Sequence, residues 1–322
     1  SLIVGLGTGS STIFVNQEYA EQTMRGGHSD LKKSTDSENK TKGLDLDYAT
    51  QWSYGIDESL SFIIPGVMGG ASSYDVGTDS ELYKSLVKHG VPRNSAAQFC
   101  SNAPLYWGDQ PFTAGNVYMG AIVCFLFVLG LLIVKGPYKW AILAATLFSV
   151  FLAWGHNFMP LTEFFFKYFP LYNKFRAVSS ILIVAEITMP LLGFLAVKVL
   201  MDGTITRKKA IKNIYIAAGI TAGLCLFIAL FGSMVFDFHA PIDAGLASQL
   251  PEFAYQGILD ERASLMRSDA LRSFLFIVLA SVTLWVFVKG WLKWSYMVAI
   301  LGVLVLADMW PINKRYLNDS HF

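Results

Sequence analysis

Residues 213–236 read Asn-Ile-Tyr-Ile-Ala-Ala-Gly-Ile-Thr-Ala-Gly-Leu-Cys-Leu-Phe-Ile-Ala-Leu-Phe-Gly-Ser-Met-Val-Phe and contain no charged side chain. The basic run Arg207-Lys208-Lys209 lies shortly before this segment, and Asp237 follows it. About 20 consecutive apolar residues are enough for a helix to cross the roughly 30 Å of hydrocarbon in a bilayer. The segment therefore predicts a membrane-spanning helix.

Five further apolar segments repeat this pattern, so we predict six transmembrane helices. They lie at 117–134, 140–155, 177–197, 273–288 and 295–307. Tryptophans, which are enriched at membrane interfaces, flank the two shorter segments at the end of the chain. Residues 1–15 are expected to be the end of a further, partial helix whose start is missing.

Composition agrees with a membrane protein and excludes other classes. Hydrophobic residues make up 53% of the 322 residues and charged residues 15%, against about 25% charged in an ordinary globular domain. The net charge is +1 and no basic run exceeds three residues, which excludes a nucleic-acid-binding protein. The three cysteines and the scattered histidines lack the spacing of a disulfide framework or a metal site, so we expect no metal.

The charges of the connecting loops predict the orientation. The loops at 135–139, 198–212 and 289–293 hold nine basic residues and one acid, Asp202, whereas the whole chain has 25 basic and 24 acidic residues. Because short cytoplasmic loops are rich in Lys and Arg, we place these three loops in the cytoplasm. The extracytoplasmic parts are then the loop region 16–116, the outer loops 156–176 and 237–272, and the segment 310–322.

These assignments give an all-α polytopic membrane protein, with a six-span bundle over residues 117–309 and interfacial helices in the outer loops. Capping-box spacing from Thr78 to Glu81 predicts a short amphipathic helix at 79–89, with its apolar face on the bundle or the lipid surface. The aromatic loop 156–176 suits a re-entrant or interfacial helix broken at Pro170. A helix beginning near Pro251 is expected to lie on the membrane.

Glu186 is the one charged residue within the predicted span 177–197, about 15 Å along the helix at 1.5 Å per residue. A carboxyl group there must be paired, protonated or facing water. Pro190 removes the helix hydrogen bond to the Glu186 carbonyl and predicts a kink. Two interpretations stay open: a polar cavity or ion path, and a protonated carboxyl bonded to Ser or Thr of a neighbouring helix.

Lys174 and Arg176 lie at the outer mouth of the same predicted helix. Together with Ser179, Ser180 and the amides of the helix N-terminus, they have the composition of an anion-binding site. Interfacial side chains that reach toward lipid headgroups would explain the two cations equally well.

The outer region also mixes carboxylates with aromatic residues, a composition that suits the binding of sugars. The candidate general bases are Glu18, Asp57 and Asp109, and the candidate sugar or acceptor contacts are Trp52, Tyr54 and Trp107. Spacing alone does not choose a base among the three acids, and a structural role is the alternative for each.

Five strings of the chain resemble the YfhO family of bacterial membrane proteins. They are Glu-Tyr-Ala-Glu-Gln-Thr-Met-Arg-Gly-Gly at 18–27, Gly-Leu-Asp-Leu-Asp-Tyr-Ala-Thr-Gln-Trp-Ser-Tyr-Gly at 43–55, Tyr-Trp-Gly-Asp-Gln-Pro-Phe at 106–112, Tyr-Asn-Lys-Phe-Arg-Ala-Val-Ser at 172–179, and Asp-Met-Trp-Pro-Ile-Asn-Lys-Arg-Tyr-Leu-Asn-Asp at 308–319. The resemblance runs over nearly the whole chain.

This resemblance implies a glycosyltransferase of the GT-C architecture in the bacterial cytoplasmic (inner) membrane. Such enzymes take a sugar from a polyprenyl-phosphate carrier on the outer face and transfer it to an envelope glycan or lipid. The resemblance further implies that Lys174 and Arg176 bind the donor phosphate, that no cofactor is needed, and that the chain is the middle of a longer protein. No residue of the chain matches the catalytic acid that GT-C enzymes usually carry in their first outer loop.

The leading hypothesis is therefore a membrane glycosyltransferase whose partners are membrane lipid, a polyprenyl-phosphate-linked sugar and an envelope glycan acceptor. A lipid or solute translocator, with the helix of Glu186 and Pro190 as a broken element, is one alternative. A non-catalytic scaffold for envelope assembly is the other.

Overall fold

The computed structural model of the chain describes residues 10–21, 44–240 and 242–317. Within these ranges the regular secondary structure is helical, apart from an isolated antiparallel bridge between Tyr74 and Ala103. The chain forms two compact units: unit 1 comprises residues 1–54 and 151–181, and unit 2 comprises residues 55–150 and 182–322.

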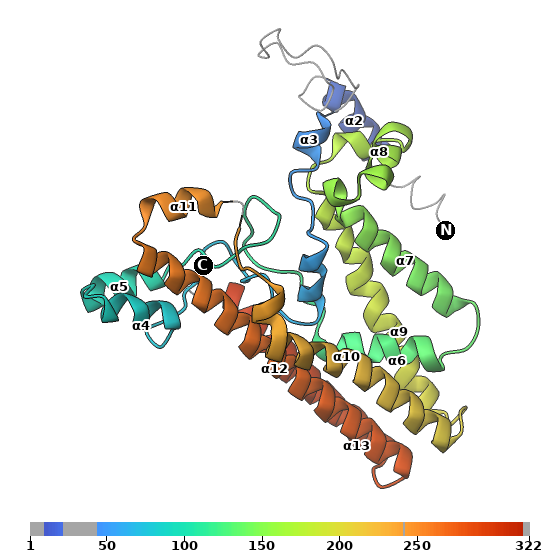
Figure 1. Cartoon of the computed structure of the whole chain (residues 1–322). Coiled ribbons are helices and arrows are strands. Elements are labelled where there is room, and N and C mark those ends of the chain that lie inside the picture. Colours follow the sequence, from blue (N-terminus) through green and yellow to red (C-terminus); the bar gives the residue numbers. More distant parts are fainter. Residues whose placement is uncertain (1–9, 22–43, 241, 318–322) are drawn as a thin grey trace. The chain divides into compact units, whose positions relative to one another are not determined.

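Unit 2 contains a bundle of apolar helices. Its members are α6 (Ala121–Ile133), α9 (Ile183–Met201), α10 (Arg207–Val235), α12 (Glu252–Lys289), α13 (Trp294–Tyr316) and the part of α7 (Tyr138–Ala153) that precedes residue 151. α6 packs against both α9 and α10. Figure 1 shows α12 running beside α10 and α13, and α12 makes contacts with both helices.

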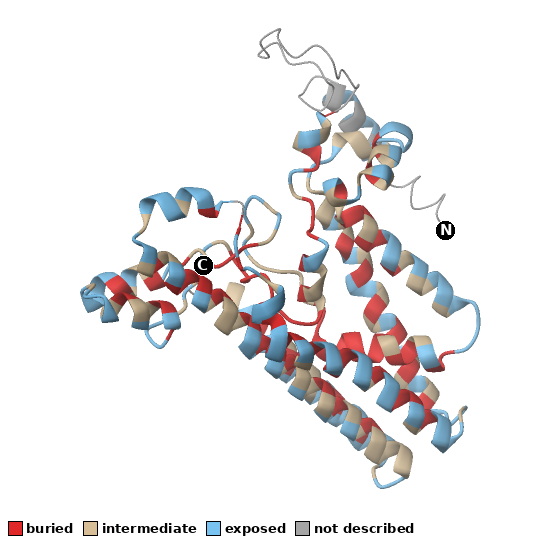
Figure 2. Cartoon of the chain, in the orientation of Figure 1, coloured by how far each residue is buried: buried red, intermediate tan, exposed pale blue. Residues whose placement is uncertain are grey.

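Four helical segments are long and apolar enough to cross a membrane, namely Val178–Met201, α10, α12 and α13. Only 22% to 39% of the residues in their most apolar windows are buried within the protein, and Figure 2 shows exposed residues along these helices. Phe194, Met234 and Val303 are among the large apolar side chains exposed there. Because apolar surface of this extent requires lipid, the chain is a multi-pass membrane protein.

The six predicted spans are all helical, but they are not equivalent. α6 is a shorter apolar helix, and α7 is long and apolar enough to cross a membrane only together with residues 155–168, from which a sharp bend separates it. The described residues thus contain four spanning helices, or five if the bent pair is one span. Of the predicted partial helix at 1–15, residues 1–9 lie outside the described residues and the rest begin α2 (Ser10–Glu21).

α12 differs from its prediction. We expected one helix lying on the membrane from Pro251 and a separate span at 273–288, but a single helix of 38 residues runs from Glu252 to Lys289. No Gly or Pro lies between Ile258 and Lys289 to interrupt it. At 1.5 Å per residue the helix is about 57 Å long, well beyond the roughly 30 Å of hydrocarbon. Its charged N-terminal half therefore extends out of the apolar part of the bundle.

The N-terminal half of α12 packs against α4 (Glu81–Lys88), the helix predicted at 79–89. Leu82 and Leu86 are buried as an amphipathic helix requires, and they lie in a cluster with Ala254 and Ile258 of α12, a helix of the bundle. The predicted cap at Thr78 is wrong. The cap is Ser80, whose hydroxyl accepts a hydrogen bond from the amide of Tyr83 at 3.2 Å.

Unit 1 is smaller and is built from α2, α3 (Leu46–Ala49), α8 (Met159–Tyr168) and short 3-10 helices. α8 ends before Pro170, where the sequence predicted a break. Leu44, Ala49 and Phe166 form its buried core. The amide of Leu44 donates to the carbonyl of Asn173 at 2.9 Å, so the segment 44–54 is joined to the later part of the unit.

Candidate functional site

Arg176 of unit 1 lies on a platform of two aromatic rings. Its guanidinium carbon is 4.1 Å from the ring centroid of Trp52 and 5.0 Å from that of Tyr48. One guanidinium nitrogen also donates to the Tyr48 hydroxyl at 2.6 Å. Arg176 is exposed, and a guanidinium carries five N–H donors, so donors remain for an anion. The stacking fixes the position of the charge without neutralising it.

Lys174 is half-buried at the end of the 3-10 helix η4 (Tyr172–Lys174), two residues before Arg176. Leu171 and Ala177, on either side of this stretch, have positive φ angles of 67° and 66°. Left-handed backbone is unfavourable for residues other than glycine and persists only where the surroundings enforce it. The two predicted phosphate-binding cations therefore lie on a stretch of constrained backbone.

The helix N-terminus expected beside these cations is not available. Residues Val178–Leu182 form a 3-10 helix, η5, and α9 starts only at Ile183. The Ser179 amide donates to the carbonyl of Trp52 at 3.4 Å, and the Ser180 amide donates to the carbonyl of Ala177 at 3.1 Å. Both backbone amides are therefore used inside the fold and do not point to an anion.

Glu58 of unit 2 organises the loop at residues 106–112. Its side chain is 2% exposed and accepts hydrogen bonds from the Gly55 amide at 2.9 Å, the Tyr106 hydroxyl at 2.8 Å and the Gln110 side-chain amide at 3.1 Å. The backbone amide of Gln110 in turn donates to the Tyr106 hydroxyl at 2.9 Å. The loop is thus folded around one buried carboxyl group.

Burial raises the pKa of Glu58 above its usual value of 4.5, and the hydrogen bonds from Gly55, Tyr106 and Gln110 oppose that rise. The negative charge of nearby Asp109 adds to the rise. A Cβ built on Gly55 would lie 3.0 Å from an Asp109 carboxylate oxygen and 3.2 Å from the Glu58 Cβ, so both acids border this glycine. Unequal environments for two neighbouring carboxyl groups are a common arrangement in acid–base sites.

Of the three predicted bases, Asp109 is the one that this cluster includes. It is exposed, and it belongs to the loop held by Glu58. Asp57 is exposed at the start of the 3-10 helix η2 (Asp57–Phe62), and Glu18 is exposed on α2 in unit 1. Sequence reasoning did not single out Glu58, because nothing in the spacing links it to Tyr106 and Gln110.

The predicted sugar contacts have different environments. Tyr54 is fully buried, and Trp107 is only 8% exposed. The Trp107 ring packs edge-on against Phe236 and Phe238, with centroids 5.7 and 5.4 Å away. Trp52 is half-buried and stacks on Arg176. Of the three, only Trp52 therefore has a ring beside an exposed cation.

Glu186 lies in the first turn of α9, because the α-helix begins at Ile183 rather than near residue 177. Its side chain is exposed, and among the described residues it has no hydrogen bond or ion pair. Thr188, two residues onward, bonds instead to Thr146 of α7, with 2.7 Å between the two hydroxyl oxygens. Pro190 lies inside α9, and the helix continues beyond it to Met201.

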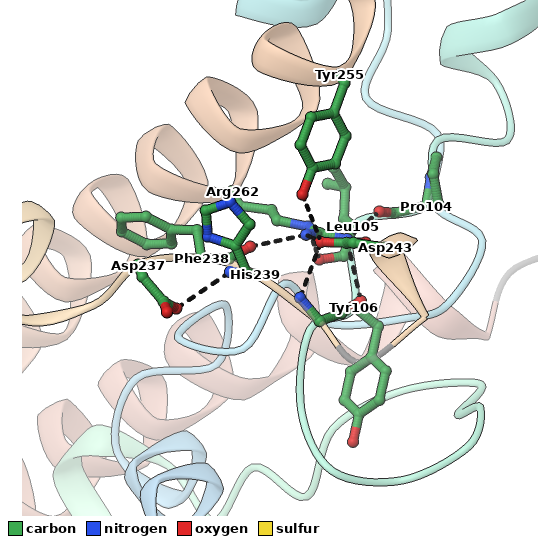
Figure 3. A network of polar contacts seen from close by, with 10 residues as sticks. Pro104, Leu105, Tyr106, Asp237, Phe238, His239, Asp243, Tyr255 and Arg262 are labelled. Carbon is green, nitrogen blue, oxygen red and sulfur yellow. Dashed lines mark hydrogen bonds and ion pairs between the residues drawn. The ribbon is translucent and has the colours of Figure 1, made fainter. Parts of the chain in front are cut away.

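A buried ion pair holds the backbone next to the Glu58 cluster (Figure 3). Arg262 of α12 is fully buried and pairs with Asp243 of α11 (Asp243–Gln249), with the longer of its two hydrogen bonds at 3.1 Å. Arg262 also donates to the carbonyls of Pro104 at 2.9 Å, Leu105 at 3.0 Å and Phe238 at 2.7 Å. The backbone entering the 106–112 loop is therefore fixed by α12, while Glu58 fixes its side chains.

Sequence reasoning missed this role of α12. Its charged residues Arg262, Asp269 and Arg272 are spaced by seven and three positions, which places them on one face of a helix. That spacing was a usable signal. Among the described residues, no group of three His, Cys, Asp or Glu side chains is arranged to hold a metal ion.

Comparison with known proteins gives no match to a family model, to a curated protein or to a solved structure. Function is therefore inferred from the residues of this chain.

Proposed function

We propose that this membrane protein binds a polyprenyl-phosphate-linked sugar on its extracytoplasmic face and transfers the sugar to an envelope glycan or lipid. The observation that carries the proposal is Arg176, an exposed cation fixed on the rings of Trp52 and Tyr48, with Lys174 two residues away. A phosphate needs fixed cations, and a sugar needs an aromatic surface and hydrogen-bonding groups. The long apolar helices suit a substrate with a polyprenyl tail.

In this proposal Arg176 and Lys174 bind the donor phosphate and stabilise the negative charge that grows on it as the glycosidic bond breaks. The acceptor hydroxyl loses its proton to a carboxylate as it attacks the sugar. Two of the candidate bases are kept for this role: Glu18, which lies in the same unit as the two cations, and Asp109, the exposed acid of the loop that Glu58 organises in unit 2. Glu58 is a positioning residue, since its carboxyl group is buried and bonded on both oxygens.

We also propose that the chain belongs to the YfhO family and has the six-span GT-C architecture, with residues 16–116 outside the bacterial cytoplasmic membrane. α6 and the bent pair of α7 with residues 155–168 would supply the two spans beyond the four long helices. The five strings that resemble the family and the basic cytoplasmic loops support this proposal.

The decisive test compares Arg176→Gln with Lys167→Gln, a matched loss of one exposed cation in the same unit. Lys167 forms a surface ion pair with Glu163 at 3.2 Å and lies outside the aromatic platform. Binding of polyprenyl monophosphate to the protein in nanodiscs should weaken about 10-fold to 100-fold for Arg176→Gln, as expected for a charge-assisted hydrogen bond, and stay unchanged for Lys167→Gln. Sugar incorporation in cells should fall in parallel at normal expression. Equal binding by both variants would refute the assignment.

A further inference from the structure

The three loops rich in Lys and Arg meet at one end of unit 2. A cavity of about 500 Å³ is lined by Lys135 from the turn between α6 and α7, by Lys139 from the first turn of α7, and by Lys209 from the first turn of α10. A Cβ built on Gly290, in the turn between α12 and α13, would lie 3.2 Å from a guanidinium nitrogen of Arg207. All three loops that the sequence placed in the cytoplasm are therefore neighbours.

The walls of this cavity have two kinds of surface. Leu132, near the end of α6 and 37% exposed, contributes apolar surface, and Trp140 of α7 is 61% exposed at the edge of the cavity. The Lys139 ammonium donates to the carbonyl of Leu131 at 3.0 Å and lies 5.0 Å from the centroid of the Trp140 ring. A tryptophan beside lysines is the usual composition of a membrane interface, so the cavity lies where headgroups meet acyl chains.

The charge of the cavity is not compensated. No acidic residue lines it, and within the described part of the chain none of its three lysines is in an ion pair. Three ammonium groups around a space of this size attract a compact anion of high charge, and 500 Å³ lies within the usual range of ligand sites. A free inorganic ion would leave the apolar wall without a partner. The acyl chains of a lipid would contact that wall.

We propose that this cavity binds the headgroup phosphate of an anionic phospholipid from the cytoplasmic leaflet. Basic pockets between transmembrane helices on the cytoplasmic side are suited to such headgroups. The proposal is independent of the outer site of Arg176, because the cavity lies in unit 2 and among the cytoplasmic loops. It assigns a ligand to cations that the proposed glycosyl transfer does not use.

The test measures the binding of phosphatidylglycerol to the full chain by native mass spectrometry after extraction from nanodiscs of defined composition. Lys135→Gln, Lys139→Gln and Lys209→Gln are combined in one variant. The control variant combines Lys198→Gln, Lys208→Gln and Lys293→Gln, which remove the same total charge from the loops at 198–212 and 289–293 but do not line the cavity. Affinity should fall about fivefold per lysine and about a hundredfold for the triple site variant, and much less for the control.

A double variant, Lys135→Gln with Lys209→Gln, covers the case in which loss of the Lys139 bond to Leu131 prevents folding, and it should lose about 25-fold in affinity. Equal lipid binding by the site and control variants would overturn the proposal. A second arm adds glycerol phosphate or inorganic phosphate. Displacement of the lipid by either ion at millimolar concentration would show that the cavity takes a free anion, and resistance to both would support the lipid assignment.

Discussion

Asp269 of α12 accepts two hydrogen bonds from Arg315 of α13, at 2.6 and 2.7 Å. Three residues along α12, Arg272 pairs with Asp308 of α13 at 3.1 Å, so the second ion pair has the opposite polarity. Asp308 also accepts from the Tyr118 hydroxyl at 2.7 Å and from the Ala121 amide, the first residue of α6, at 3.0 Å. The two pairs fix the register of the antiparallel helices α12 and α13, because a slip by one turn would bring like charges together.

Breaking one of these pairs should destabilise the protein strongly. Asp269 is only 1% exposed, so Asp269→Ala leaves Arg315 without its partner, and loss of one member of a buried pair costs about 3–5 kcal/mol. Thermal unfolding in detergent checks this. Lys84→Ala is the control, because it breaks an exposed pair with Glu81 that is worth about 0–1 kcal/mol. A double exchange, Asp269→Arg with Arg315→Asp, should recover part of the loss; equal stability of Asp269→Ala and Lys84→Ala would contradict this account.

The two ion pairs also show what the sequence could predict. The strings at 106–112 and 308–319 were interpreted as family resemblances. In the structure, Tyr106, Asp308 and Arg315 within these strings form a hydrogen bond and ion pairs that stabilise the fold. The apolar segments were predictable because their length alone requires lipid. The ion-pair partners of the charged residues on α12 were not predictable, because these partners lie in other segments of the chain and no sequence spacing relates them to α12.

Two local errors have simple physical reasons. Thr78 and Ser80 both precede α4, and a hydroxyl at either position satisfies a capping pattern, so the choice depends on where the helix starts. The sequence predicted two separate helices over α12, because its polar half and its apolar half suit different environments. No residue between the two halves interrupts a helix. The Glu58 cluster joins residues about 50 positions apart in irregular segments, and periodicity carries no information about such contacts.

Glu58 should give the folded state a pH dependence of known sign. Its pKa in the folded protein is raised above the usual 4.5, so the folded state holds this proton more tightly than the unfolded chain does. The contribution of the group to stability is then full below about pH 4.5 and is lost as the pH rises through the raised pKa. Glu58→Gln removes the titration. The difference in melting temperature between the wild type and Glu58→Gln should therefore shift against the wild type as the pH rises from 4 to 8. A shift in its favour would contradict the raised pKa.

Orientation is testable with introduced cysteines, because the native Cys100, Cys124 and Cys225 are buried and should react slowly. Asp79→Cys, in the region placed outside, should react with a membrane-impermeant maleimide in intact cells. Lys208→Cys, in a loop placed inside, should react only after lysis. Both positions are exposed, so a lack of reaction reports the side of the membrane rather than burial. Labelling of Lys208→Cys in intact cells would reverse the topology and remove the basis of the cytoplasmic lipid site.

The support under Arg176 predicts a graded effect on donor binding. Trp52→Leu keeps an apolar side chain but removes the ring under the guanidinium, and an exposed cation–π contact is worth about 0.5–1 kcal/mol, or roughly twofold to fivefold in affinity. Tyr48→Phe keeps its ring and removes only the hydroxyl that accepts from Arg176. Polyprenyl phosphate binding should therefore weaken more for Trp52→Leu than for Tyr48→Phe, and both should weaken it less than Arg176→Gln.

The variant Asp109→Asn tests the proposed base separately from the binding of the donor. If it is the base, Asp109→Asn should lower the transfer rate about 10²-fold to 10⁴-fold while polyprenyl phosphate binding stays unchanged, because an amide cannot accept the proton of the acceptor hydroxyl. Asp57→Asn is the matched control, an exposed acid of the same unit that lies outside the loop held by Glu58. Glu58→Gln should reduce transfer less than Asp109→Asn does, since it disturbs the position of Asp109 without removing its carboxylate. If Asp109→Asn kept full activity while Arg176→Gln lost donor binding, the outer face would still bind the lipid phosphate, and the base would have to be another acid.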